Sequence, residues 1–346
     1  MTRIAPLASV LLLAGCIAAP AGRTALPFPA NRSFASPLLH AAVGFSVDTP
    51  DRANEAASEG ITSTILYNGS AAGSSLEVAL QQHHISVIDG GVSSIVFYWE
   101  CHRTHTVALP PASYAYNYYC RTDEDPSISS EVIALARVSK LLDRDATRPY
   151  VAGYWVLDDW ASWDYGSGQH LLQKIRALIA SKTPGRPAIC GFGAEIGVGT
   201  KYSWDPGTAK NYSKAGCDMV GWYNYSPFGL THPSNGDKLN WAMTGLLPAM
   251  GASLAKYGWN VANTPLMGIG QAWSGKYGKR DYQPGLSVAQ MQTQASAFCN
   301  YGATSISWYA WDDSQDVKQT QTPNNSPAIA AGIAAGLSAC RSTWGS

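Results

Sequence analysis

Short runs of β-branched and aromatic residues alternate with helical patterns along this sequence from residue 42 onward. The runs that predict strands are 42–47, 62–67, 85–88, 151–157, 187–192, 219–225, 266–272 and 305–311. The helical patterns are 53–59, 76–82, 131–142, 171–181, 208–214, 239–257, 289–300 and 329–340. Strands that alternate with helices predict parallel pairing, and eight such units predict an α/β fold of the (β/α)8 TIM-barrel type.

A doubly wound open sheet is the alternative α/β architecture. It usually carries a phosphate-binding first turn, whereas the first strand here runs into Val47-Asp48-Thr49-Pro50. The chain has 346 residues, of which 46% are hydrophobic, enough for one large core. Because no internal repeat or linker interrupts the alternation, we expect a single barrel over 41–346.

The first residues have the composition of an export signal. One charge, Arg3, precedes an uncharged stretch over 5–14, which is too short to span a membrane but matches a signal-peptide core. Leu13-Ala14-Gly15-Cys16 is similar to the lipobox of bacterial lipoproteins, in which the cysteine carries the lipid. We expect a signal peptide over 1–16 with lipidation at Cys16, or a secretory signal over 1–21, and a tether over 17–40. Either route predicts an extracellular protein, secreted or lipid-anchored at the bacterial cell surface.

Cysteine parity agrees with export. Seven cysteines are present, and six remain without Cys16, an even number suited to disulfides in an oxidising compartment. The pairing that we expect is Cys101–Cys120, Cys190–Cys217 and Cys299–Cys340. The first of these would staple an elaborated loop after the third strand. The sequence contains no Cys-x-x-Cys pair, so we do not expect the cysteines to bind a metal.

Charge and aromatic content narrow the choice of partner. The chain has 24 basic and 24 acidic residues and no basic run, which argues against nucleic acid, and against any membrane contact other than the lipid anchor. It has 12 Trp and 18 Tyr against 7 Phe, a balance that favours flat rings able both to stack and to hydrogen-bond. We therefore expect a monomer that binds a neutral oligo- or polysaccharide.

The fourth predicted strand carries the most specific motif. It reads Gly-Tyr-Trp-Val-Leu-Asp-Asp at 153–159 and is followed by Trp160 and Trp163, while the last strand ends at Trp311. With the alternation, this resembles (β/α)-barrel glycoside hydrolases, in many families of which the fourth strand reads Gly-Tyr-Tyr/Trp-x-x-Asp-Glu. Asp159 stands where those families carry Glu, and the seventh strand offers Gln271 in place of the second Glu of the large retaining clan. The Asp-x-x-Asp-x-Asp-x-Glu run of chitinase-like barrels is missing as well, so no single family is indicated.

The resemblance implies cleavage of glycosidic bonds by two carboxyl groups, one a proton donor and the other ionised as base or nucleophile. Adjacent strand residues point to opposite faces, so Asp158 and Asp159 do not easily fill both roles. We expect Asp159 to be the general acid and Asp158 its positioning or electrostatic partner. The second catalytic carboxylate is left open among Asp312, Glu195, Asp48 and Asp89.

In a barrel, functional groups gather at the C-terminal ends of the strands. The substrate-binding residues expected there are Asp48, Tyr67, Asp89, Trp160, Trp163, Tyr223, Tyr225, Gln271, Trp273, Trp308 and Trp311. Each has a plain structural alternative, since Asp after a strand often caps a helix and strand aromatics often fill a core. Their convergence on one rim predicts a site, for which we expect no cofactor and no metal.

Two other functions stay open. A barrel that binds glycans without cleaving them would use the same aromatic rim, and Gln271 favours that reading. A different secreted hydrolase, for example a metal-dependent deacetylase, would need ligands such as Glu100, His102 and His105, which do not form the helical His-Glu-x-x-His pattern. We expect this last segment to be a loop stapled by Cys101–Cys120.

Overall fold

The structure is a computed structural model of the chain and describes residues 38–106, 125–158, 167–193, 216–223, 247, 251, 264–277, 282–312 and 317–345. The predicted signal peptide lies outside these residues, as does most of the predicted tether. Leu38, within that tether, is buried and packs in the interior of the barrel. Among the described residues, none of the helices combines the length and the apolar character needed to cross a membrane.

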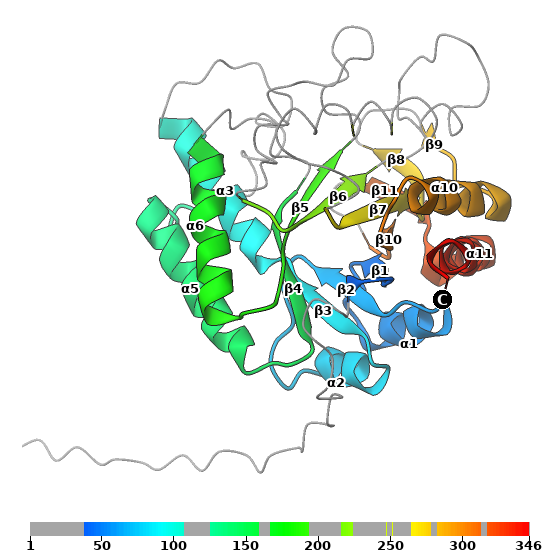
Figure 1. Cartoon of the computed structure of the whole chain (residues 1–346), viewed down its shortest axis with the longest axis horizontal. Helices are drawn as coiled ribbons and strands as arrows, with labels where there is room; N and C mark the ends of the chain where they lie inside the picture. Colours follow the sequence, from blue (N-terminus) through cyan, green and yellow to red (C-terminus); the bar gives the residue numbers. More distant parts are fainter. Residues whose placement is uncertain are drawn as a thin grey trace, which may run out of the picture.

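Parallel strands close a barrel in the order β1-β10-β7-β6-β5-β4-β3-β2 (Figure 1). The strands are β1 (Ala42–Phe45), β2 (Ser63–Leu66), β3 (Ser86–Asp89), β4 (Val151–Leu157), β5 (Ala188–Gly193), β6 (Met219–Tyr223), β7 (Leu266–Gln271) and β10 (Ser305–Tyr309). Each overlaps a predicted strand, so the predicted (β/α)8 barrel is confirmed.

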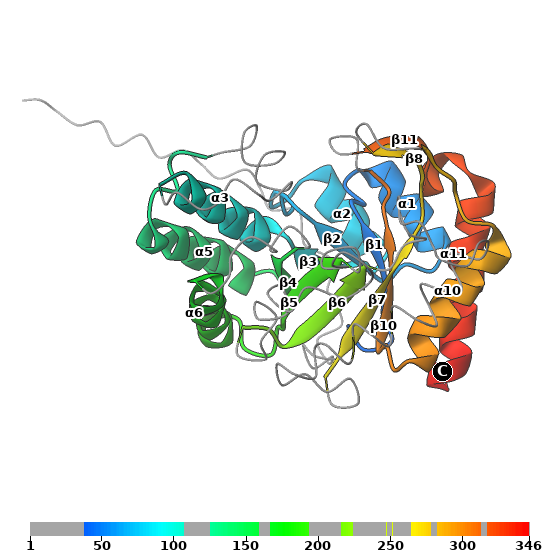
Figure 2. The same cartoon turned by 90° about the horizontal axis from the view of Figure 1, so that it is seen from above.

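Helices cover the outside of the barrel, with α5 and α6 on one side and α10 and α11 on the other (Figures 1 and 2). They are α1 (Pro50–Ser58), α2 (Ser75–Gln82), α3 (Gly91–Thr106), α5 (Glu131–Ala146), α6 (Ser167–Lys182), α10 (Val288–Asn300) and α11 (Pro327–Trp344), with a 3-10 turn η4 (Pro323–Asn325). Several of these helices have an N-cap side chain that accepts a hydrogen bond from a backbone N–H of the first turn. These N-cap residues are Thr49, Ser74, Ser130 and Ser287. The predicted helix at 208–214 lies outside the described residues, as does most of 239–257.

Helix α3 corrects the expectation of a loop over 100–105. Val92, Val96 and Cys101 of this helix are buried. The segment is rich in β-branched and aromatic residues, which favour helix weakly, so its packing and not its propensity decides its structure. Cys101 is disulfide-bonded, but its expected partner Cys120 lies outside the described residues.

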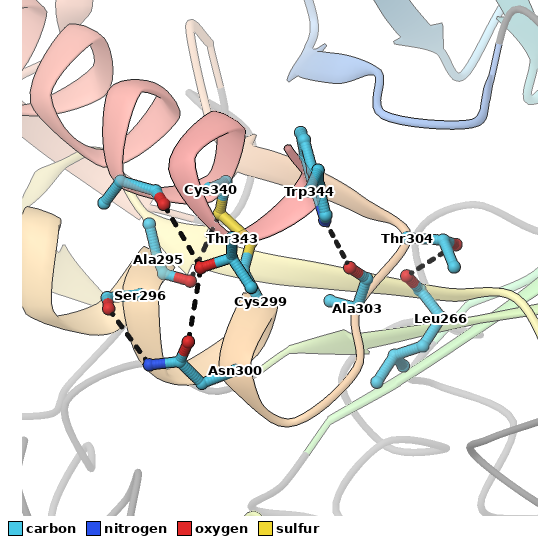
Figure 3. Close-up of a disulfide and its surroundings, with 11 residues drawn as sticks. Leu266, Ala295, Ser296, Cys299, Asn300, Ala303, Thr304, Cys340, Thr343 and Trp344 are labelled. Carbon is cyan, nitrogen blue, oxygen red and sulfur yellow. Dashed lines mark hydrogen bonds between the residues drawn. A yellow bond between two sulfur atoms is a disulfide. The ribbon is translucent and has the colours of Figure 1, made fainter. Parts of the chain in front are cut away.

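Two predicted disulfides are confirmed. Cys190–Cys217 joins β5 to the residues just before β6, so this disulfide lies after the fifth strand and not the third. Cys299–Cys340 joins α10 to α11 (Figure 3). Around it, the Thr343 hydroxyl donates to Asn300 Oδ1 at 3.2 Å, and the Trp344 indole N–H donates to the Ala303 backbone carbonyl at 2.8 Å.

A second sheet, not predicted, stands outside the barrel (Figure 2). Its antiparallel strands are β8 (Ser274–Tyr277), β9 (Tyr282–Gln283) and β11 (Val317–Gln321), in the order β11-β8-β9. Because β8 follows β7 and β11 follows β10, the sheet extends the C-terminal ends of these two barrel strands. We call it the accessory sheet.

A large indole packs among the apolar side chains inside the barrel. Trp155 points inward from β4 and meets Phe45 of β1 edge to face, with ring centroids 5.5 Å apart. Gly191 and Gly221 leave room for it, since a Cβ at these positions would lie 2.0 Å and 2.7 Å from atoms of the indole. This apolar filling supports the mouth of the barrel above it.

Candidate active site at the barrel mouth

Four side chains from alternate strands form the uppermost described layer inside the barrel. They are Tyr67 after β2, Asp158 after β4, Tyr223 at the end of β6 and Tyr309 at the end of β10. Layers of four side chains from alternate strands are the usual packing of such barrels, where apolar residues dominate them. Here the layer consists of three phenols and one carboxyl group, and we call it the mouth layer.

Hydrogen bonds connect three members of the mouth layer. The Tyr223 hydroxyl donates to Asp158 Oδ1 at 2.8 Å, and the Tyr67 and Tyr223 hydroxyl oxygens lie 3.3 Å apart. In the closed barrel β2 and β6 stand opposite one another, and β4 stands midway between them. The two tyrosines therefore meet across the barrel, and Asp158 reaches their junction from the side.

A β-bulge gives Asp158 its place in this layer. Strict alternation from the inward Trp155 would turn Leu157 inward and Asp158 outward. The pairing of β4 with β5 shifts register between Trp155 and Leu157, and Leu157 packs in the outer core instead. The extra residue re-aims the strand end, so Asp158 and not Leu157 faces the mouth.

Burial divides the mouth layer into an inner and an outer pair. Asp158 and Tyr223 are only 5% and 4% exposed, whereas Tyr67 and Tyr309 are half-buried. Phe45 packs against the rings of Tyr67, Tyr223 and Tyr309 at centroid distances of 6.1, 5.7 and 5.3 Å. The layer can thus offer a ligand two phenol edges, with a hydrogen-bonded carboxyl group beneath them.

Asp48 and Asp312 lie on another side of the mouth. Arg52, in the first turn of α1, pairs with Asp48 and also with Asp312, the latter at 3.0 Å. Burial alone would lower the pKa of the Arg52 guanidinium, but the two carboxylates outweigh it and raise that pKa. This triad joins the corner after β1 to the end of β10, the strand opposite β4.

Asp89 points to the outer side of β3. Its Oδ1 accepts the Gly91 N–H at 2.7 Å, and Arg144 of α5 pairs with its other oxygen. Burial and the nearby Asp145 carboxylate raise the pKa of Asp89 to about 6, against the opposing effect of Arg144. Its partners belong to the helical layer, which gives it a structural role.

The carboxamide of Gln271 is engaged with the backbone. Its Nε2 donates to the Trp273 carbonyl at 2.8 Å and to the Pro284 carbonyl at 2.9 Å, and its backbone N–H donates to Gln294 at 3.0 Å. Gln271 is fully buried and Trp273 is 2% exposed. Gln271 therefore ties the end of β7 to both ends of the β8–β9 segment.

Trp308 and Trp311 pack on the outer side of the barrel. A Cβ added to Gly336 of α11 would lie 2.7 Å from the Trp308 ring, and one added to Gly44 would lie 2.8 Å from Trp311. Both side chains are fully buried. The expected site residues Asp159, Trp160, Trp163, Glu195 and Tyr225 lie outside the described residues.

Tyr309 is a mouth residue that the sequence reasoning did not select. The alternation in β10 could have indicated it. Ser305, Ser307 and Tyr309 share one face of this strand, and Ile306 and Trp308 share the other. In a barrel covered by helices the outer face must be apolar, which turns the Ser-Ser-Tyr face inward. Within the described ranges, no group of three or more His, Cys, Asp and Glu side chains could hold a metal ion.

No family model and no curated protein matches this sequence. Solved structures do match the fold. A β-galactosidase from the psychrophilic Marinomonas ef1 is 12% identical with a TM-score of 0.54, over 86% of this chain and 59% of that one. The Lactobacillus rhamnosus β-glucuronidase and the Ruminococcus gnavus β-glucuronidase are each 11% identical with a TM-score of 0.50, over 86% of this chain and 49% of theirs. This chain therefore spans about half to three fifths of the length of these glycoside hydrolases and shares the barrel fold with them.

Proposed function

We propose that this protein is an extracellular carbohydrate-active hydrolase that cleaves glycosidic bonds in a neutral oligo- or polysaccharide. The mouth layer is the observation that supports the proposal. A buried carboxyl group, fixed by a phenol at the C-terminal end of a barrel strand, is costly to maintain for packing alone. Half-buried tyrosines beside it supply the amphipathic surface that sugar rings bind.

The proposed roles of the two adjacent acids differ. Asp158 accepts a hydrogen bond from the Tyr223 hydroxyl, and a hydrogen bond donated by a phenol stabilises the ionised form of a carboxyl group. This suits an electrostatic or positioning partner. Asp159 is the proposed general acid, which delivers its proton to the glycosidic oxygen as the bond breaks.

The proposed second carboxylate is Glu195. Asp48 and Asp312 are engaged with Arg52, and Asp89 faces the outer side of β3. Glu195 follows β5, the strand that pairs with β4. It would act as base or nucleophile on the sugar that Asp159 protonates.

The proposed location is outside the cytoplasm. Cys190–Cys217 and Cys299–Cys340 agree with an oxidising compartment, and the lipobox-like segment at 13–16 provides the route there.

Activity of the mature chain on a panel of oligo- and polysaccharides tests the proposal, with release of reducing ends as the readout. Asp159→Asn should lower kcat by about 100-fold or more, since it removes the general acid. Asp143→Asn is the matched control, because this Asp is 62% exposed on α5 and pairs with Lys182. Its activity should stay within about two-fold, as expected for an exposed ion pair. Turnover that survives Asp159→Asn unchanged would exclude the proposed acid.

A glycan-binding barrel without catalysis is the second candidate. The engaged carboxamide of Gln271 favours it, because the end of β7 then contributes structure and not a reacting carboxylate. Binding of a glycan by both the native chain and Asp159→Asn, without turnover by either, would establish this alternative.

A further inference from the structure

We infer that Tyr223 is a positioning residue that fixes Asp158 as an ionised hydrogen-bond acceptor, and that Tyr67 directs Tyr223 from the opposite side of the barrel. The catalytic meaning of this arrangement rests on the proposed function, but the arrangement itself does not. It reassigns Tyr223 from sugar contact to control of an acid.

The burial of Tyr223 supports this role. At 4% exposure, its hydroxyl lies against Asp158 Oδ1 and is not presented to solvent. Its ring is held by Phe45, Tyr309 and Trp155, at centroid distances of 5.7, 5.8 and 6.3 Å. A ring packed on three sides keeps its hydroxyl in one place, so the direction of the hydrogen bond is fixed before any ligand arrives.

The two phenols form a hydrogen-bond chain with a defined direction. A hydroxyl has one proton, and an ionised carboxylate can only accept. Because the Tyr223 proton goes to Asp158, the Tyr223 oxygen must accept at the 3.3 Å contact, and Tyr67 must donate. Donation runs from Tyr67 to Tyr223 to Asp158, and each bond polarises the next.

This chain has a consequence for the neighbouring acid. A fixed negative charge disfavours ionisation of a second carboxyl group close by. The hydrogen bond from Tyr223 favours the ionised form of Asp158, and an ionised Asp158 would in turn favour the protonated form of Asp159, as a general acid requires. Among the described residues, the titratable groups that share the mouth layer with Asp158 are the phenols of Tyr223, Tyr67 and Tyr309, while Asp89 and Arg144 lie on the outer side of β3.

The test is an NMR titration of aspartate side-chain carboxyl carbons in the full mature chain, in which Asp158→Asn identifies the Asp158 signal. Tyr223→Phe removes the donated proton and keeps the ring, so the Asp158 midpoint should rise by about one pH unit. Tyr67→Phe should raise it by less. Tyr301→Phe is the control, because this ring packs on Trp222 outside the barrel interior and should leave the midpoint unchanged.

The outcomes separate this inference from the proposed function. An Asp158 midpoint that is the same in the native chain, Tyr67→Phe and Tyr223→Phe overturns the inference, whatever the activity. A raised midpoint in a chain without turnover supports the positioning role and counts against the enzyme. If Tyr223→Phe does not fold, Tyr67→Phe decides the matter alone. In an active enzyme, Tyr223→Phe should also move the acid limb of the pH profile upward and lower kcat more than it changes KM.

Discussion

The buried acids Asp158 and Asp89 lie in different environments. Asp158 faces a phenol that donates to it, whereas Asp89 faces a second carboxylate, Asp145, together with Arg144. Burial and Asp145 raise the pKa of Asp89 from 3.8 to about 6. The folded state therefore binds this proton more tightly than the unfolded chain does. The resulting stabilisation is fully present below about pH 4 and is lost as the pH rises through about 6.

Asp89→Asn should remove this dependence, because an amide does not titrate. The stability of the native chain relative to this variant should fall by on the order of 2 kcal/mol between pH 4 and pH 7.5. Urea unfolding of both proteins across that range measures the difference. A difference that is flat with pH, or that grows as the pH rises, would show that Asp89 is already ionised at pH 4.

At the scale of elements, α10 and α11 depend on a covalent link as well as on packing. Cys299 and Cys340 are 41 residues apart, and closing a loop of that length removes chain entropy from the unfolded state. The double variant Cys299→Ser/Cys340→Ser should lose about 3–4 kcal/mol in urea unfolding. Thr343→Ala, which removes one hydrogen bond between the same helices, should lose only about 1 kcal/mol. Equal losses would mean that the disulfide adds nothing beyond local contacts.

Elements with a strong pattern were predictable and short polar ones were not. The barrel strands have buried, β-rich sequences, and each was predicted within a few residues. The accessory sheet was not predicted because segments such as 317–321, Val-Lys-Gln-Thr-Gln, are polar at four of five positions and show no alternation of apolar and polar residues. Helix α3 was not predicted because its β-branched and aromatic residues have a higher propensity for strand than for helix.

The site shows the same limit at finer scale. The ends of the predicted strands located the residues near the rim. They did not show whether each side chain points into the barrel or toward the helices. The bulge in β4 turns Asp158 to the mouth, and no sequence rule gives its position. Trp308 was expected at the rim because it ends a strand, yet the pairing places it under α11, and the polar residues of the same strand face inward.

At the scale of the whole molecule, the pairing of β1 with β10 closes the barrel, and further contacts lie at both ends of this junction. At the mouth, Arg52 bridges Asp48 and Asp312 across the β1–β10 junction. At the opposite end, the His40 ring stacks on Trp344 of α11 with centroids 4.9 Å apart, and its backbone N–H donates to the Thr304 carbonyl at 2.6 Å. The first and last strands of the barrel are thereby held together at both ends. The residues of the mouth layer lie at or just after the ends of β2, β4, β6 and β10.

The central claim is that the mouth layer is the floor on which a sugar binds. A crystal structure of Asp159→Asn with an oligosaccharide chosen by the activity or binding panel tests it most directly. We predict a sugar ring over Tyr67 and Tyr309, with Asp158 still hydrogen-bonded to Tyr223 beneath it. A saccharide bound elsewhere, for instance on the accessory sheet, with the mouth layer untouched, would contradict the claim.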